Sequence, residues 1–304
     1  AADAACYQAK NKGRNRIQIY QPDELEAGKY QEREFWVSRI DRALTSPQTP
    51  ILGETQFCLY YQPIVSLSKD ELAKEYCEVL LRLVDENGEV IPPMAFLPVA
   101  ERYDLMPSID RWVISTFFSI LSQRGWENRN RLLYGINLST ASVNDDRFLE
   151  FLSEQLSVHK IRPESLCFEI TENIAISNFN KFTKLIVALK ALGFRVSLDD
   201  FGRNICSFSY LKQVPVDYLK INGDLIKNIS DDIIVYETVK SINHIAHLIG
   251  MQTIAKFVST DIIMEKVTAA GIDYAQGYGV AAPRPLVVKP SPLYEASLLK
   301  RRCS

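Results

Sequence analysis

The stretch Phe194-Arg195-Val196-Ser197-Leu198-Asp199, followed directly by Asp200, indicates how the whole chain is organised. Its apolar residues predict a buried β-strand, and two acidic residues stand where that strand ends. The amphipathic stretch before it, Phe179–Leu192, has the spacing of a helix. A helix followed by a buried strand is typical of a parallel α/β fold.

The same alternation continues in both directions from this stretch. Eight runs read as strands: Phe57–Leu67, Tyr76–Val84, Leu132–Ser139, Leu166–Thr171, Phe194–Asp199, Val216–Ile221, Gln252–Ala255 and Tyr274–Ala275. Amphipathic stretches of helical spacing lie between most of them. Eight strands that alternate with helices favour an α/β fold of the (β/α)₈ TIM-like barrel type over an open sheet.

Composition excludes several classes of protein. The 304 residues are 47% hydrophobic and 24% charged, which is typical of a globular chain. Lys and Arg number 35 against 37 for Asp and Glu, and this near-balance argues against a DNA partner. No apolar run approaches the roughly 20 residues that cross a bilayer, so we expect no membrane segment in this chain. The six cysteines form no CxxC pair and favour a reduced, cytoplasmic protein.

Polar and acidic residues recur where the expected strands end. They are Glu78, Asn137, Glu169, Asp199, Asp200, Lys220, Asn222, Lys256 and Gln276. In a (β/α)₈ barrel the carboxyl ends of the strands meet at one mouth, where such enzymes do their chemistry. Buried carboxylates are costly unless they are paired or bind a metal. The pattern therefore indicates a hard divalent cation with oxygen ligands, Mg²⁺ or Mn²⁺.

At these residues the sequence resembles the EAL domain family. The motifs that carry the resemblance are Glu78-Val79-Leu80-Leu81-Arg82, Asn137-Leu138-Ser139, Glu169-Ile170-Thr171-Glu172, Leu198-Asp199-Asp200-Phe201-Gly202, Asp217-Tyr218-Leu219-Lys220-Ile221 and Gln276-Gly277-Tyr278. They follow the family order and cover residues 30–286. The family comprises bacterial phosphodiesterases that open cyclic di-GMP to the linear dinucleotide pGpG.

The first residues resemble the last helix and strand of a GGDEF domain, through Ala2–Lys10 and Gly13–Arg16. The resemblance implies a piece of a tandem GGDEF–EAL protein. We expect a GGDEF remnant over 1–22, a helical linker over 23–50, an EAL barrel over 51–286 and a C-terminal tail over 287–304. It also implies a cytoplasmic bacterial protein that forms a homodimer through the barrel. Membrane anchoring through regions upstream stays open.

The resemblance also implies roles for single residues. Glu78, Asn137, Glu169 and Asp199 would hold the first metal ion, and Asp200 would face the second metal ion and the ligand. Lys220 would orient the attacking water, Gln276 would help to fix the site, and Glu172 would anchor the loop after Asp199. Gln62 and Arg82 would contact cyclic di-GMP, and a planar guanidinium suits either a phosphate or a guanine face.

Two positions depart from the family pattern. Asn222 stands where the family has Asp, and Lys256 stands where it has Glu. The first change removes one negative charge and the second removes one and adds a positive one, so the second-metal site is about three charge units less favourable to a cation. The loop Gly202–Ser207 is altered as well. Two-metal hydrolysis needs both ions, so we expect binding of cyclic di-GMP with little or no hydrolysis.

Two other interpretations remain open. The chain is an active phosphodiesterase if Asn222 coordinates through its carboxamide oxygen and Lys256 swings clear of the site. It is an interaction module without a ligand if the barrel serves only as a platform for dimerisation.

Overall fold

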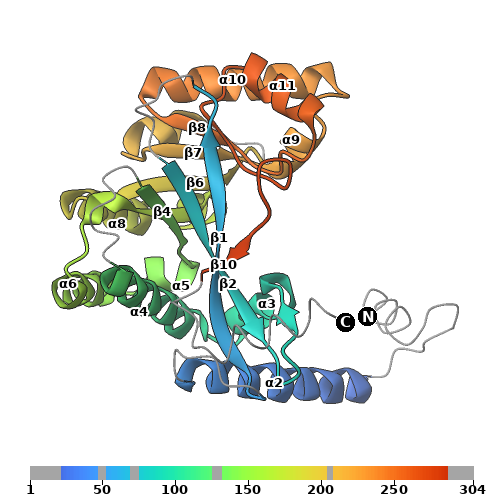
Figure 1. Cartoon of the computed structure of the whole chain (residues 1–304), viewed down its shortest axis with the longest axis vertical. Coiled ribbons are helices and arrows are strands. Elements are labelled where there is room, and N and C mark those ends of the chain that lie inside the picture. Colours follow the sequence, from blue (N-terminus) through green and yellow to red (C-terminus); the bar gives the residue numbers. More distant parts are fainter. Residues whose placement is uncertain (1–21, 47–52, 69–74, 125–131, 204–207, 287–304) are drawn as a thin grey trace, which may run out of the picture. The chain divides into compact units, whose positions relative to one another are not determined.

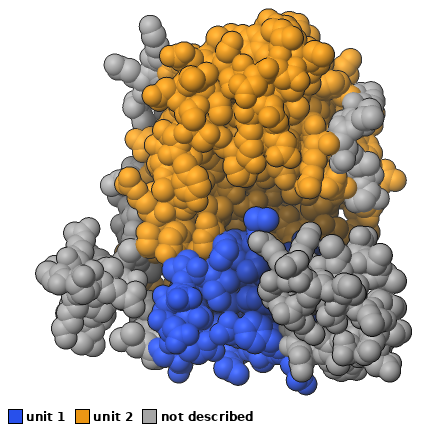
Figure 2. Space-filling model, turned by 90° about the vertical axis from the view of Figure 1, so that its right-hand side faces the viewer, with its two compact units in different colours: residues 1–57, 83–105 blue, residues 58–82, 106–304 orange. Residues whose placement is uncertain are grey.

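The computed structural model describes residues 22–46, 53–68, 75–124, 132–203 and 208–286. Two compact units divide the chain (Figure 2). One comprises residues 1–57 and 83–105, and the other comprises residues 58–82 and 106–304. The second unit carries every residue of the expected site.

Eight strands form the closed barrel, and all eight coincide with strand-like runs of the sequence within about two residues at each end. They are β1 (Gln56–Ser66), β2 (Glu75–Val84), β4 (Leu132–Asn137), β5 (Leu166–Thr171), β6 (Arg195–Phe201), β7 (Tyr218–Ile221), β8 (Gln252–Ala255) and β9 (Tyr274–Ala275). Their order around the barrel is β1-β9-β8-β7-β6-β5-β4-β2, and β1 also pairs with β2, which closes the ring. The expected TIM-like barrel is confirmed.

The expectation of an all-parallel sheet is wrong for the first strand. The other seven barrel strands, from β2 through β4 to β9, pair with one another in parallel, but β1 runs antiparallel to β9, with Val65 opposite Ala275. The reason lies in the connection from β1 to β2, which spans only residues 67–74. A parallel crossover needs a dozen residues or more, so this connection can join only antiparallel strands.

Helices follow most of the parallel strands and surround them (Figure 1). They are α4 (Met106–Arg124), α5 (Thr140–Val143), α6 (Phe148–His159), α7 (Glu172–Ser177), α8 (Phe179–Ala191), α9 (Gly223–Lys227), α10 (Ile233–Ile249) and α11 (Asp261–Ala269). Two 3₁₀ helices, Pro163–Ser165 and Phe208–Gln213, and the short strand β10 (Arg284–Pro285) complete this unit. α10 illustrates how sequence sets the ends: Asp232 accepts hydrogen bonds from two backbone amides at its start, and Gly250 ends it at φ 90°.

The other unit contains α2 (Pro22–Thr45), the short strand β3 (Val90–Ile91), the 3₁₀ helix Pro93–Ala95 and α3 (Leu97–Arg102). Arg39 of α2 donates to Glu86 at 2.7 Å, and Thr55 donates to the same carboxylate. α2 matches the expected helical stretch, and its role as a linker stays a prediction. The expected GGDEF remnant and C-terminal tail lie outside the described residues, apart from Pro22. Across the described ranges, none of the helices combines the length and apolar character needed to span a membrane.

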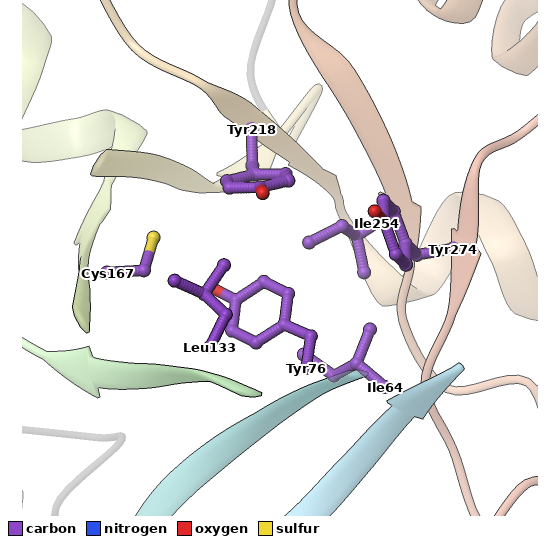
Figure 3. Close-up of a cluster of buried hydrophobic side chains, with 7 residues drawn as sticks. All are labelled: Ile64, Tyr76, Leu133, Cys167, Tyr218, Ile254 and Tyr274. Atoms are coloured by element: carbon purple, nitrogen blue, oxygen red, sulfur yellow. The ribbon is translucent and has the colours of Figure 1, made fainter. Parts of the chain in front are cut away.

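One layer of side chains fills the middle of the barrel (Figure 3). Seven strands each contribute one buried residue: Ile64, Tyr76, Leu133, Cys167, Tyr218, Ile254 and Tyr274. The barrel is therefore packed rather than hollow. Alternate residues of a strand point to the same side. In the parallel strands the next inward positions therefore lie two residues after this layer, toward the carboxyl ends of the strands.

Candidate functional site

Five of the expected site residues occupy those next inward positions. Glu78, Glu169, Lys220, Lys256 and Gln276 each follow a residue of the interior layer by two positions.

β1 reaches the same level from the opposite direction. Because this strand is antiparallel, Gln62 precedes Ile64 by two residues rather than following it. Gln276 Nε2 donates to Gln62 Oε1 at 3.2 Å, so the first and last strands of the barrel meet at this level.

Lys220 lies at the centre of the site with no exposed side-chain surface. Its ammonium donates to Glu78 Oε2 at 2.8 Å and to Glu169 Oε2. Two amides complete the shell of Glu78, since Asn137 Nδ2 and Gln276 Nε2 each donate to this carboxylate at 2.7 Å. The structure thus brings together four residues of the expected metal and catalytic sets around one buried ammonium.

The two glutamates of this centre titrate in opposite directions. Burial alone would raise the pKa of Glu78, but Lys220 and the two amide donors lower it to about 2. Burial, reinforced by the Glu78 carboxylate, raises the pKa of Glu169 from 4.5 to about 7. Burial would lower the pKa of Lys220, but the same carboxylates hold it well above its usual value. Between these carboxylates Lys220 carries a positive charge at neutral pH.

Lys256 spans the two adjacent aspartates. Its Nζ lies 2.8 and 3.0 Å from the two carboxylate oxygens of Asp199 and 2.7 Å from Asp200 Oδ1. Asp200 adopts a left-handed backbone conformation at φ 56°, and its amide donates to Asp199 Oδ1. Burial would lower the pKa of Lys256, but the aspartates outweigh it and keep that pKa above its usual value.

Asn222 is buried at the end of β7, and its carboxamide oxygen has a local partner. Oδ1 accepts a hydrogen bond from the Asp224 amide at 2.9 Å and so caps α9. An Asn at a helix start satisfies an otherwise unpaired backbone donor. In this arrangement the Asn222 oxygen is bonded to the backbone of its own loop.

Glu172 opens α7 and reaches the segment after β6. Its carboxylate accepts from the Gly202 amide at 3.2 Å and from the Tyr210 hydroxyl at 2.7 Å. The carboxylate therefore holds the start of the altered loop and the 3₁₀ helix that follows it. Residues 204–207 of that loop lie outside the described part of the chain.

Arg82 and Gln62 lie on neighbouring strands. Arg82 stands over the Tyr60 ring, 5.5 Å from its centroid, and donates to its neighbour's carbonyl at Leu81. Gln62 Nε2 donates to the Ala281 carbonyl at 2.9 Å.

Sequence reasoning missed Tyr76 and Gly135. The Tyr76 hydroxyl donates to Glu169 Oε1 at 2.7 Å, so a residue of the interior layer also holds the site. A Cβ atom at Gly135 would lie 2.1 Å from that same oxygen, and only glycine leaves room for it. An isolated glycine inside the run Leu132–Asn137 is a signal of close approach that the sequence does offer.

The donor types of the expected first ion suit a hard divalent cation, and in this structure the ammonium groups of Lys220 and Lys256 lie against its carboxylates. Three carboxylates and a carboxamide are the ligand types that Mg²⁺ and Mn²⁺ prefer. Gln276 Oε1 is buried beside them and has no hydrogen-bond partner among the described residues. As the side chains stand, no three His, Cys, Asp or Glu residues of the described segments form a group that could hold a metal.

The donors of the expected second ion do not fit. Lys256 neutralises Asp199 and Asp200, and Asn222 turns its oxygen to α9. The place of the second ion is therefore next to the positive charge of Lys256, whereas a cation would need a negative ligand there.

Comparison with known proteins gives the family. The EAL domain profile matches residues 47–283. The chain is 37% identical over 287 residues to cyclic di-GMP phosphodiesterase PdeB of Shewanella oneidensis, which covers 94% of this chain and 32% of the relative. It is 38% identical over 239 residues to cyclic di-GMP phosphodiesterase PdeF of Escherichia coli, covering 78% and 31%. The chain thus spans about a third of the length of these relatives.

Solved structures agree with the sequence relatives. The FimX EAL domain of Pseudomonas aeruginosa bound to c-di-GMP superposes with a TM-score of 0.73 at 29% identity, covering 82% of this chain and 96% of that one. The FimX EAL domain of Xanthomonas citri in complex with c-diGMP gives 0.75 at 28% identity, with coverage of 87% and 99%. The match over most of the chain, in sequence and in fold, shows that it belongs to the EAL domain family.

Proposed function

We propose that this chain binds cyclic di-GMP and hydrolyses it little or not at all, acting as a sensor of that dinucleotide. The position of Lys256 carries the proposal: its ammonium lies within 3.0 Å of both Asp199 and Asp200. Hydrolysis by two ions needs a cation on the attacking and on the leaving oxygen. With the Lys256 ammonium fixed between the aspartates, only the first of the two metal ions can bind.

Binding is supported by residues that the two departures leave intact. Gln62 and Arg82, to which the family resemblance gives the ligand contacts, are both retained, and Arg82 offers a planar guanidinium to a phosphate or a guanine. Two solved EAL domains similar to this chain are described as complexes with c-di-GMP. The phosphodiesterase names of the curated relatives favour a second candidate, an active hydrolase.

One assay separates the two candidates. The protein is incubated with cyclic di-GMP and Mn²⁺, bound ligand is measured by calorimetry, and pGpG is measured by chromatography. Binding without product supports the sensor. Turnover comparable to that of an intact family member overturns it and selects the hydrolase, and neither binding nor product selects an interaction module.

The double variant Asn222→Asp, Lys256→Glu restores the family residues and should gain pGpG formation. The variant Asn228→Asp, Lys184→Glu makes the same change of charge on exposed residues of the barrel unit and serves as its control. Product from both variants alike would show that net charge, rather than the site, limits hydrolysis.

The surroundings of the barrel are part of the proposal. We assign residues 1–22 to the end of a GGDEF domain, and we place the protein in the bacterial cytoplasm as a homodimer through the barrel. Light scattering of the purified chain tests the dimer, and a monomer at all accessible concentrations would refute it.

A further inference from the structure

We infer that the Lys256 ammonium is a built-in cation that replaces the second metal ion, so that the chain takes up at most one divalent ion and binds cyclic di-GMP without needing one. This inference rests on the proposed function for its ligand. Its statement about metal uptake stands independently of that ligand.

The contacts of Lys256 match those expected of a bound cation. Three carboxylate oxygens from two residues surround Nζ at 2.7, 2.8 and 3.0 Å. An ammonium carries three N–H donors, so these oxygens use its full capacity. The Lys256 side chain is 15% exposed and that of Asp199 is 8%, so this pair is largely desolvated, whereas the Asp200 side chain is 33% exposed and keeps contact with solvent.

The position of Lys256 in the chain fixes this charge in place. It follows directly on β8, whose last residue Ala255 pairs with Ile221 of β7 and with Ala275 of β9. The pairing of β8 with β7 and β9 therefore positions the Lys256 ammonium beside the aspartates. A free ion would have to displace a cation that cannot diffuse away, and it would meet like-charge repulsion while doing so.

The same charge favours the anionic ligand. Without a cation at this place, the adjacent carboxylates of Asp199 and Asp200 would repel the phosphates of a cyclic dinucleotide. An intact second-metal site solves this by binding an ion, which makes the site depend on supply of that ion. Lys256 removes the dependence because its charge is always present.

Metal uptake is tested first, in the absence of cyclic di-GMP. Electron paramagnetic resonance of a Mn²⁺ titration should count at most one bound ion per wild-type chain and two in the variant Asn222→Asp, Lys256→Glu. Two ions on the wild-type chain would overturn the inference, whether or not the protein binds the dinucleotide.

Ligand binding is tested next, in chelator and in Mn²⁺. Wild-type affinity for cyclic di-GMP should agree within about twofold between the two conditions. Lys256→Met should weaken binding in chelator at least about tenfold and recover in Mn²⁺, whereas Lys256→Arg should keep the wild-type behaviour. Thermal unfolding confirms that both variants fold, and Lys184→Met controls for loss of an exposed charge. Loss of wild-type binding in chelator alone would overturn the inference, whereas no binding in either condition would refute the proposed function and leave the Mn²⁺ count to decide.

Discussion

Gly135 determines where the Glu169 carboxylate can lie. A methyl group at this position would come within 2.1 Å of Oε1, within 2.9 Å of the carboxylate carbon and within 3.1 Å of the Tyr76 ring. Gly135 itself pairs with Glu78 on one side and with Cys167 on the other, so the backbone has little freedom to move away. The centre of the site therefore depends on a residue that has no side chain.

Gly135→Ala should lower the free energy of unfolding by about 1–3 kcal/mol, the usual effect of overpacking. Urea denaturation measures the change. In a Glu169→Ala background the two closest contacts are gone and only the Tyr76 ring remains at 3.1 Å, so the same substitution should have a much smaller effect. An equal loss in both backgrounds would show that the strand itself, rather than the carboxylate, requires glycine.

Among the secondary-structure elements, α9 explains why one departure from the family pattern is structurally harmless. Asn222 caps this helix through its side-chain oxygen, and Asn and Asp are equally good residues for that role. The helix can thus start at the same place with either residue. What the change alters is the charge at the end of β7.

Asn222→Ala should lower stability by about 1 kcal/mol because the Asp224 amide loses its partner. Asn222→Asp should leave stability within about 0.5 kcal/mol of wild type, since a carboxylate accepts the same hydrogen bond. Equilibrium denaturation of the two variants checks both values. Equal losses in both would rule out the cap as the structural role of this side chain.

For the chain as a whole, the pKa of Glu169 makes stability depend on pH. In the unfolded chain this group titrates near 4.5, and in the folded chain at about 7. Between these values the folded state keeps a proton that the unfolded state has released, so its contribution to stability falls as pH rises. Below 4.5 both states are protonated and this contribution is constant.

We therefore expect the metal-free protein in chelator to lose thermal stability between pH 5 and pH 7, and Glu169→Gln to flatten that slope. Calorimetric melting at a series of pH values is the measurement. Glu150→Gln removes an exposed carboxylate and should leave the slope unchanged. A wild-type melting temperature that rises over this interval would contradict the assignment.

The sequence was sufficient for the barrel and for the positions of most residues of the expected site, for a physical reason. Buried strands require apolar runs, and a polar residue at the end of such a run must face something that satisfies it. Glu78 and Glu169 are recognisable on this ground alone. The reversed direction of β1 was missed, although the short connection to β2 contains the information.

Other features depend on contacts between distant segments. The sequence predicts Tyr76 to be a core residue, and it is one. Its second role, the hydrogen bond to Glu169, follows only from the distance between the two side chains in the fold. Whether Lys256 turns toward Asp199 or away from it depends on the packing of β8 against its neighbours. No local pattern encodes such an orientation.

The reversed first strand also has a consequence for synthesis on the ribosome. Val65 of β1 can pair with Ala275 of β9 only after roughly 210 further residues have been translated, which takes about 10–40 seconds. During that time one edge of β1 has its backbone groups unpaired, and such edges invite association with other chains. The yield of native protein should therefore respond to translation speed and to chaperones more than the stability of the finished barrel would indicate.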